Sequence, residues 1–230
     1  MLRVKNSKDK ILAIGQYKIL NVLYKDKNKD IYHVVDMKKP HLVLTLRILK
    51  LNQSPSQIDK EIEILNILNQ YHEMLHFYNI QILSDKLIFL FDYTRGYNLK
   101  QIVNKDPKFL YKGKLLQFIV NMVYILVIYQ KHNIIHNNIN PSNIIFDGKR
   151  FHLIGLSNAT IDLDNTIGNG NDIYSIGLVL FYIIFGKEYN NDIKIDKSID
   201  EKIFYILERM LKENIEDRIK LHEIVDLLDK

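Results

Sequence analysis

The chain of 230 residues has the length of one large or two small domains, and 47% hydrophobic and 26% charged residues are ordinary for a globular protein. It has no cysteine, which excludes disulfides, thiolate metal ligands and cysteine nucleophiles. The net charge of +5 is uneven, because residues 1–50 carry 12 Lys and Arg against 4 Asp and Glu. Such a basic quarter can bind an acidic protein, nucleic acid or an anionic membrane, or it can be an ordinary solvated surface.

Strand patterns dominate the first part of the chain. They cover residues 17–23, 31–35, 41–50, 79–83 and 87–91. Alternation in the third strand puts Leu44, Leu46 and Ile48 on one face and Val43, Thr45 and Arg47 on the other. Because an arginine shares the second face with apolar neighbours, we expect that face to border a cleft or a partner group.

One helix interrupts these strands. Ser54, Pro55 and Gln57 form a helix start with a capping box, and the helix is predicted to end near residue 69. Its apolar stripe is predicted to consist of Ile58, Ile62 and Leu65. Residues 93–96 form a connector, in which Gly96 acts as a hinge or turn.

Helices dominate the chain from residue 115 onward. Residues 115–132 are apolar nearly all round and are predicted to be deeply buried, and residues 144–154 form a hairpin with an Asp147-Gly148 turn. Asp172 is predicted to cap the next helix, which ends at Gly186. The last helices are predicted at residues 198–212, with a capping box from Ser198, and at 221–228.

Neither long apolar stretch is predicted to cross a membrane. Residues 115–129 and 173–185 are shorter than the roughly 20 residues that span a bilayer. Residues 1–10 are polar and lack the pattern of a signal peptide. We therefore expect a cytoplasmic protein without a membrane span.

The order of five segments resembles eukaryotic-type Ser/Thr protein kinases. Residues 134–146, IIHNNINPSNIIF, resemble the catalytic loop, which reads H-R-D-[L/I]-K-P-x-N between apolar runs. Residues 172–177, DIYSIG, resemble the start of the central buried helix of that family, and 208–218 resemble the late segment that ends in a structural arginine. Residues 44–50 and 60–65 are similar to the strand that carries V-A-[IL]-K and to the helix after it.

This resemblance implies an α+β, kinase-like two-lobe fold in a single domain of residues 1–230. Residues 1–92 would form a small β-rich N-lobe with one main helix, residues 93–96 the hinge, and residues 97–230 a mostly helical C-lobe.

The phosphate-binding parts of this family are altered in the N-lobe. Tyr24, Asp26 and Lys29 stand where the glycine-rich loop has its glycines, and only Ile31, at the position of its valine, is retained. Arg47 replaces the strand lysine and Thr45 the alanine beside it. Arg47 keeps the positive charge and can pair with Glu61, although both can also be surface charges. Phe91 is expected to line the vestigial nucleotide cleft.

The catalytic loop retains His136 and Asn143 but loses its charged residues. Asn138 replaces the aspartate and Asn140 the lysine, so the proton acceptor is absent. Gly155 replaces the metal-binding aspartate of D-F-G, so Asn143 has no carboxylate companion for a metal. We therefore interpret His136 and Asn143 as structural residues of the loop.

The segment that follows is short, and it too points away from substrate binding. Only 16 residues separate Gly155 from Asp172, and A-P-E is missing. Arg218, which pairs with that glutamate in the family, is expected to contact Asp162 or Asp164 or to face solvent. Asp172 and Gly177 are retained, and we expect structural roles for both.

These losses together predict a pseudokinase, a scaffold or allosteric regulator without phosphotransfer activity. We expect no cofactor and no metal site, and neither ATP nor Mg²⁺ is expected to bind. The predicted partner is a protein, for example an active kinase or another regulated protein. The candidate partner surface consists of Lys25, Lys27 and Lys29.

Other functions remain open on the sequence. A divergent nucleotide-binding phosphotransferase could use Arg47, Glu61, Asp162 and Asp164, with Phe91 beside the adenine. The basic N-lobe could bind an anionic surface or nucleic acid, although no aromatic platform or known motif accompanies its lysines. Residues 72–76 spell the H-E-x-x-H zinc motif, but no third ligand follows, and we interpret the match as chance.

Overall fold

The computed structural model is α+β, as expected from the sequence, and its chain divides into two compact units. Unit 1 comprises Met1–Asp59 and Leu68–Arg95, and unit 2 comprises Lys60–Ile67 and Gly96–Lys230. Helix α1 (Pro55–Leu68) therefore contributes residues to both units. The structure describes residues 13–49, 54–83, 86–107, 113–162, 170–190 and 199–229.

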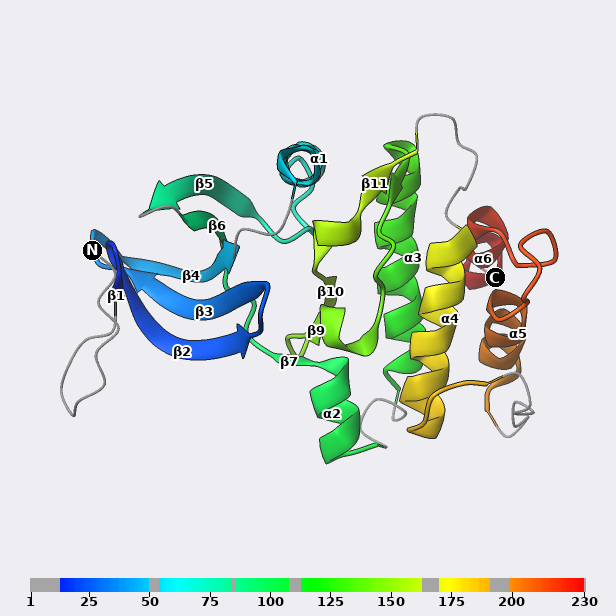
Figure 1. Ribbon diagram of the computed structural model, residues 1–230. Helices are drawn as coiled ribbons and strands as arrows, with labels where there is room; N and C mark the ends of the chain where they lie inside the picture. Colours follow the sequence, from blue (N-terminus) through cyan, green and yellow to red (C-terminus); the bar gives the residue numbers. More distant parts are fainter. Residues whose placement is uncertain are drawn as a thin grey trace. The chain divides into compact units, whose positions relative to one another are not determined.

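Unit 1 contains one antiparallel sheet of six strands (Figure 1). The strands lie in the order β1-β2-β3-β4-β6-β5. They are β1 (Ala13–Ile14), β2 (Tyr17–Lys25), β3 (Lys29–Asp36), β4 (Lys39–Leu49), β5 (Phe77–Leu83) and β6 (Lys86–Asp92).

One face of this sheet forms an apolar core. The predicted face of β4 is part of it, and Leu44, Leu46 and Ile48 are each at most 3% exposed. The sheet is curled, since the Gln81 side-chain amide on edge strand β5 reaches the Tyr17 hydroxyl on β2, four strands away in the sheet order, and donates a 2.9 Å hydrogen bond to it. The curl encloses a hollow at one end of the sheet.

Helix α1 begins as predicted. The Gln57 N–H donates to the Ser54 hydroxyl and the Ser54 N–H to the Gln57 side chain, which is a capping box. The predicted stripe was only partly right, because Leu65 is buried while Ile58 and Ile62 are intermediate. The other buried residues of the helix are Glu61, Ile64 and Leu68.

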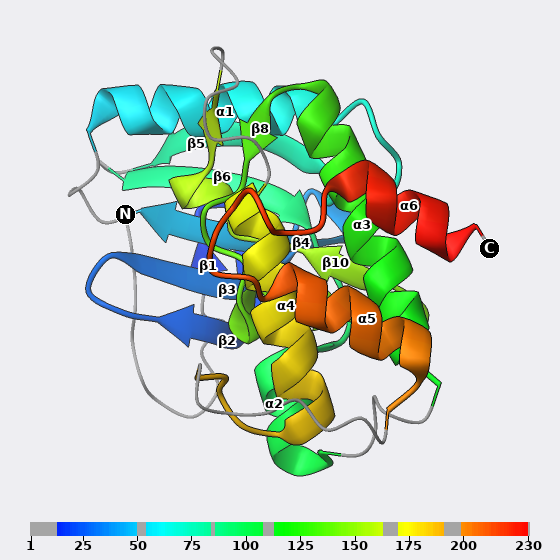
Figure 2. The ribbon, with the colours of Figure 1, turned by 90° about the vertical axis from the view of Figure 1, so that its right-hand side faces the viewer.

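Unit 2 is mainly helical (Figure 2). Helix α4 packs against both α3 and α5, and α6 packs against α3. Its helices are α2 (Leu99–Lys105), α3 (Leu115–Lys131), α4 (Gly170–Phe185), α5 (Glu201–Met210) and α6 (Leu221–Leu228), with short 3₁₀ turns η1 (Pro141–Asn143) and η2 (Leu156–Asn158). Its short strands are β7 (Tyr97–Asn98), β8 (Ile134–Ile135), β9 (Ile144–Phe146), β10 (Phe151–Leu153) and β11 (Thr160–Ile161).

Glycines in unit 2 allow close approaches between elements. A Cβ atom on Gly96, where φ is +147°, would overlap the carbonyl oxygen of Phe146. A Cβ atom on Gly177 of α4 would lie 2.9 Å from the Cβ atom of Met210 in α5. The structural role expected of Gly177 is therefore to let these two helices pack closely.

The predicted hairpin is confirmed, because β9 and β10 pair antiparallel on either side of residues 147–150. Three details of the helical prediction were wrong. Helix α2 was not expected, although Asn98 and Gln101 form its capping box. The N-cap of α5 is Asp200, and the expected Ser198 lies outside the described residues. Asp172 lies inside the first turn of α4 and does not cap it.

Helix α3 is also less buried than expected. One stripe of the helix is 43–49% exposed, at a spacing that places its members on one face. These residues are Leu116, Val120, Tyr124 and Val127. In the described part of the chain no helix is long and apolar enough to cross a membrane.

Candidate functional site

Arg47, which the sequence resemblance aligns with the strand lysine of kinases, is buried among aromatic rings in unit 1. It lies opposite Ile31 on β3 and opposite Phe89 on β6, and it is only 6% exposed. The guanidinium carbon lies 4.1 Å from the centre of the Phe89 ring and 5.4 Å from that of Phe91. A cation above aromatic faces is stabilised by the ring quadrupoles, so this contact stabilises the sheet itself.

The next row on the same face contains an aromatic stack that the sequence analysis missed. Thr45 lies opposite His33 on β3 and Phe91 on β6. The His33 ring stacks on Tyr93 with ring centres 3.7 Å apart and planes 10° apart. Burial, with a contribution from the positive charge of Arg95, lowers the pKa of His33, and both ring nitrogens are buried without a hydrogen bond to any described residue. Alternation places His33 on this face, but no local signal pairs it with Tyr93.

The turn of the β2–β3 hairpin is closed by a carboxylate. Asp26 Oδ1 accepts hydrogen bonds of 2.7 Å from the N–H groups of both Asn28 and Lys29, and Oδ2 accepts one from the Tyr24 hydroxyl. The hydrogen bond from the Lys29 N–H is the main cause that lowers the pKa of Asp26. No residue of this turn has a positive φ, so glycine is not required there. An ionised carboxylate therefore occupies the tip.

The predicted partner lysines lie around this tip. The Lys25 ammonium lies 5.3 Å from the centre of the Tyr32 ring, and that of Lys29 lies 5.8 Å from the centre of the Tyr24 ring. Lys27 is exposed in the turn itself. Lys25 lies opposite Asp30 and Lys29 lies two residues before Ile31, so strand alternation puts these two side chains on opposite faces of the hairpin. The three lysines therefore surround the tip of the hairpin.

In unit 2, His136 is buried with both ring nitrogens engaged. Nε2 lies 3.1 Å from the Ile154 carbonyl oxygen, and Nδ1 lies 3.2 Å from the Asn138 N–H. Since Nδ1 accepts and Nε2 donates, the ring is a neutral tautomer. Burial lowers the pKa of His136 to about 4, although the bond to Ile154 opposes the shift.

Asp172 of α4 holds the backbone of the same loop. Its carboxylate accepts a 2.7 Å bond from the His136 N–H and a 3.0 Å bond from the Asn137 N–H. Asn137 has a left-handed backbone, with φ of 58°. Burial raises the pKa of Asp172, and the two N–H groups act against that rise. The first turn of α4 therefore fixes the turn of the loop.

Asn138, Asn140 and Asn143 bond to one another. The Asn140 amide donates to the carbonyl oxygen and the side-chain oxygen of Asn138, both at 3.0 Å. The Asn143 amide donates to the Asn138 carbonyl oxygen at 2.9 Å. Amides cannot take up a proton as a carboxylate does, so this arrangement can order the loop but cannot act as a general base.

Gly155 packs directly against Asn143. Its φ is +89°, and an added Cβ atom would lie 3.0 Å from the Asn143 side chain. Any side chain at this position, including the aspartate of D-F-G, would have a strained backbone and would require a small shift of the Asn143 side chain. Nearby, the Ser157 hydroxyl donates a long 3.5 Å bond to Glu61.

Arg218 is 6% exposed, so the expectation that it faces solvent was wrong. Its guanidinium donates to the main-chain carbonyl oxygens of Lys212, Glu213 and Gly170 and lies 4.7 Å from the centre of the Tyr174 ring. Asp164 lies outside the described residues. Arg218 thus ties the start of α4 to the segment after α5.

The predicted zinc motif at residues 72–76 and the predicted Arg47–Glu61 pair remain to be compared with the structure. His72 and Glu73 lie in a turn before β5, so residues 72–76 do not form the helix that a zinc motif requires. Among the described residues, no cluster of three or more His, Asp or Glu could hold a metal ion. The Arg47–Glu61 pair would join the two units and stays a prediction.

No family model matches the chain, and no curated protein sequence matches it.

Removing the carboxylate of Asp172 is expected to destabilise unit 2. Asp172→Ala leaves two main-chain N–H groups without an acceptor and should lower the free energy of unfolding in urea by about 3 kcal/mol. Asp172→Asn keeps one acceptor oxygen and should lose about half as much. Exposed Asp226→Ala is the control and should change stability by less than about 0.5 kcal/mol. An equal effect of Asp172→Ala and Asp226→Ala would contradict the anchoring role.

His136 is expected to weaken the fold in acid. Its pKa is 6.5 when unfolded and about 4 when folded. Between these values the unfolded chain binds a proton that the native chain does not, so stability should fall by about 3 kcal/mol as the pH drops. The raised pKa of Asp172 acts in the opposite direction, so the measurement is the difference between wild type and His136→Gln, followed by urea unfolding from pH 7 to 4. If the free energies of unfolding of the two proteins change with pH in parallel, His136 does not cause the loss of stability in acid.

Proposed function

We propose that this chain is a pseudokinase, a protein-kinase-like domain that binds protein partners and does not transfer phosphate. The proposal rests on the order of the kinase-like segments and on one structural observation, the amide network around Asn138. That network orders the loop through Asn140 and Asn143 and leaves it without a proton acceptor.

Phosphoryl transfer depends on charges that hold metal and phosphates in position. In unit 2, Asn138 and Gly155 stand at the positions of the two aspartates that supply these charges in kinases, and the space at Gly155 is taken by Asn143. Removing such electrostatic contacts removes the largest part of catalysis. The loop therefore supports a structural role better than a catalytic one.

In unit 1, the sheet face that carries Arg47 and the tip of the β2–β3 hairpin are also poorly suited to binding nucleotide phosphates. Arg47 is buried against Phe89, and the hairpin tip carries the ionised carboxylate of Asp26. A carboxylate repels phosphate, and a turn with side chains keeps its backbone at a distance. These observations support a protein without a nucleotide cofactor.

Two exposed apolar surfaces support protein binding. The first is the α3 stripe, consisting of Leu116, Val120, Tyr124 and Val127. An apolar helix face of this kind fits a second amphipathic helix, because residues four apart can interdigitate with a partner helix. The α3 stripe lies entirely within unit 2.

The second is the hairpin surface, on β2 and its turn in unit 1. Beyond the short pairing of Tyr17 and Lys18 with β1, no described strand pairs with the outer edge of β2. The exposed apolar residues of this strand are Leu20, Val22, Leu23 and Tyr24, and they adjoin Lys25, Lys27 and Lys29. A free strand edge beside lysines suits an extended partner segment with acidic residues.

Calorimetry should detect no ATP binding. We expect no saturable heat up to about 1 mM ATP, the upper end of usual enzyme KM values, with or without Mg²⁺. The physical reason is the missing metal carboxylate and the carboxylate of Asp26 at the tip. Micromolar binding that requires Mg²⁺ would instead favour a divergent phosphotransferase.

Charged substitutions on the two surfaces should disrupt partner binding. Val120→Asp tests the α3 stripe and Leu23→Asp the hairpin surface, with exposed Lys100→Asp on α2 as control. In affinity purification from the native cell with quantitative mass spectrometry, at least one protein should fall about tenfold or more with one of the first two variants, since one buried charge costs more than the 1.4 kcal/mol that changes affinity tenfold. Unchanged recovery with both would contradict these binding surfaces.

A further inference from the structure

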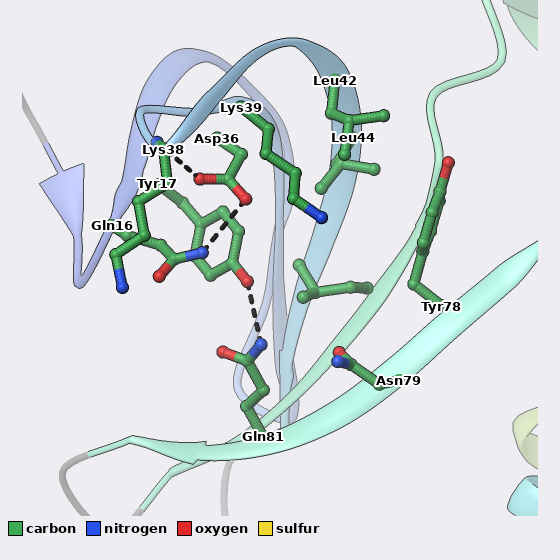
Figure 3. A pocket seen from close by; sticks show the side chains of 11 residues that line it. Gln16, Tyr17, Asp36, Lys38, Lys39, Leu42, Leu44, Tyr78, Asn79 and Gln81 are labelled. Carbon is green, nitrogen blue, oxygen red and sulfur yellow. Dashed lines mark hydrogen bonds between the residues drawn. The ribbon is translucent and has the colours of Figure 1, made fainter.

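The curled sheet of unit 1 encloses a hollow on its apolar side (Figure 3). Its volume is about 210 Å³, and its walls come from the start of β2, the β3–β4 turn, β4, β5 and β6. Leu42, Leu44 and Leu90 supply apolar surface, and Leu44 and Leu90 belong to the buried core. The hollow is thus an extension of the hydrophobic core that opens at the end of the sheet.

Two hydrogen-bond donors in the hollow are available. The Lys39 side chain extends into the space between Tyr17 and Tyr78 (Figure 3). Within the described part of the chain its ammonium makes no hydrogen bond or ion pair. The Tyr17 hydroxyl, on a side chain only 3% exposed, accepts from the Gln81 amide and also interacts with the Gln16 amide, and no hydrogen bond to a described residue uses its proton. Burial raises the pKa of Tyr17, so the hydroxyl keeps that proton at neutral pH.

Among the described residues that line the hollow, the one carboxylate is already hydrogen-bonded. Asp36 is 6% exposed, and its carboxylate accepts from the Gln16 side chain at 3.0 Å and from the Lys38 N–H at 2.9 Å. A donor from a ligand would have to compete with these bonds. The hollow therefore offers donors and a positive charge beside an apolar wall.

We propose that this hollow binds a small carboxylic acid with an apolar body. The carboxylate would accept from the Lys39 ammonium and the Tyr17 hydroxyl, and the apolar body would pack on Leu42, Leu44 and Leu90. This site belongs to unit 1 alone and does not depend on the pseudokinase proposal.

Size and charge favour this class over nucleotides and phosphate esters. Pockets for drug-sized ligands have about 300–1,000 Å³, so this hollow takes only a fragment-sized molecule. A phosphate monoester carries a charge of about −1.5 to −2, which exceeds the net charge of +1 that Lys38, Lys39 and Asp36 give to the lining. A carboxylate carries one negative charge, which this net charge balances.

The test is a titration of the full chain with phenylacetate, followed by calorimetry and by NMR shifts. Phenylacetamide is the matched neutral compound, with the same ring and no charge. We expect saturable one-to-one binding of phenylacetate, with shift changes at the methyl groups of Leu42, Leu44 and Leu90, and about tenfold or weaker binding of the amide. No binding of phenylacetate, or equal binding of both compounds, would overturn the proposal.

Matched variants locate the carboxylate. Lys39→Met removes the ammonium and should weaken binding about tenfold, while Lys86→Met at the exposed start of β6 should leave it unchanged. Tyr17→Phe should weaken it several-fold, and urea unfolding shows whether that variant remains folded. Equal affinity of the two lysine variants would overturn the site. If a peptide with a C-terminal leucine binds more than tenfold more tightly than phenylacetate, the ligand of this site is a peptide C-terminus and not a free carboxylic acid.

Discussion

The carboxylate of Asp172 is the constraint on which the candidate site of unit 2 depends. It accepts from the consecutive N–H groups of His136 and Asn137, which lie 36 and 35 residues earlier in the chain. Asn137 can then hold a left-handed backbone, and His136 reaches the Ile154 carbonyl oxygen. A buried carboxylate is costly unless its oxygens are bonded, so carboxylate and loop satisfy each other.

Side-chain amides also order the loop that the Asp172 carboxylate holds. Asn138, Asn140 and Asn143 close the loop by hydrogen bonds that carry no net charge. A loop of this shape does not need the charged residues of a phosphotransfer site to remain ordered. Asp172, His136 and Gly155 therefore fix the backbone of this loop without charged groups at Asn138 and Asn140. The backbone conformation of such a loop therefore does not depend on whether its side chains can act in catalysis.

Elements whose burial follows a period could be predicted, and contacts between distant residues could not. Alternation identified the faces of β4, and long apolar runs identified α3 and α4. The seven-residue helix α2 was missed because its main local sign is the Asn98–Gln101 capping box. The partners of Arg218 are main-chain carbonyl oxygens, which leave no mark in a sequence. The stack of His33 on Tyr93 joins a strand to the connector and has no local signal either.

The two faces of the sheet in unit 1 differ in what they leave available. On the face of Arg47, the cation lies against Phe89, and His33 stacks on Tyr93 in the next row, so polar groups there contact aromatic rings of the same unit. On the opposite face, the curl held by Tyr17 and Gln81 leaves a hollow in which Lys39 has no bonded partner among the described residues. Available donors beside apolar surface favour a ligand more than a filled face does. For unit 1, the curled side of the sheet is therefore the better place to look for small-molecule binding.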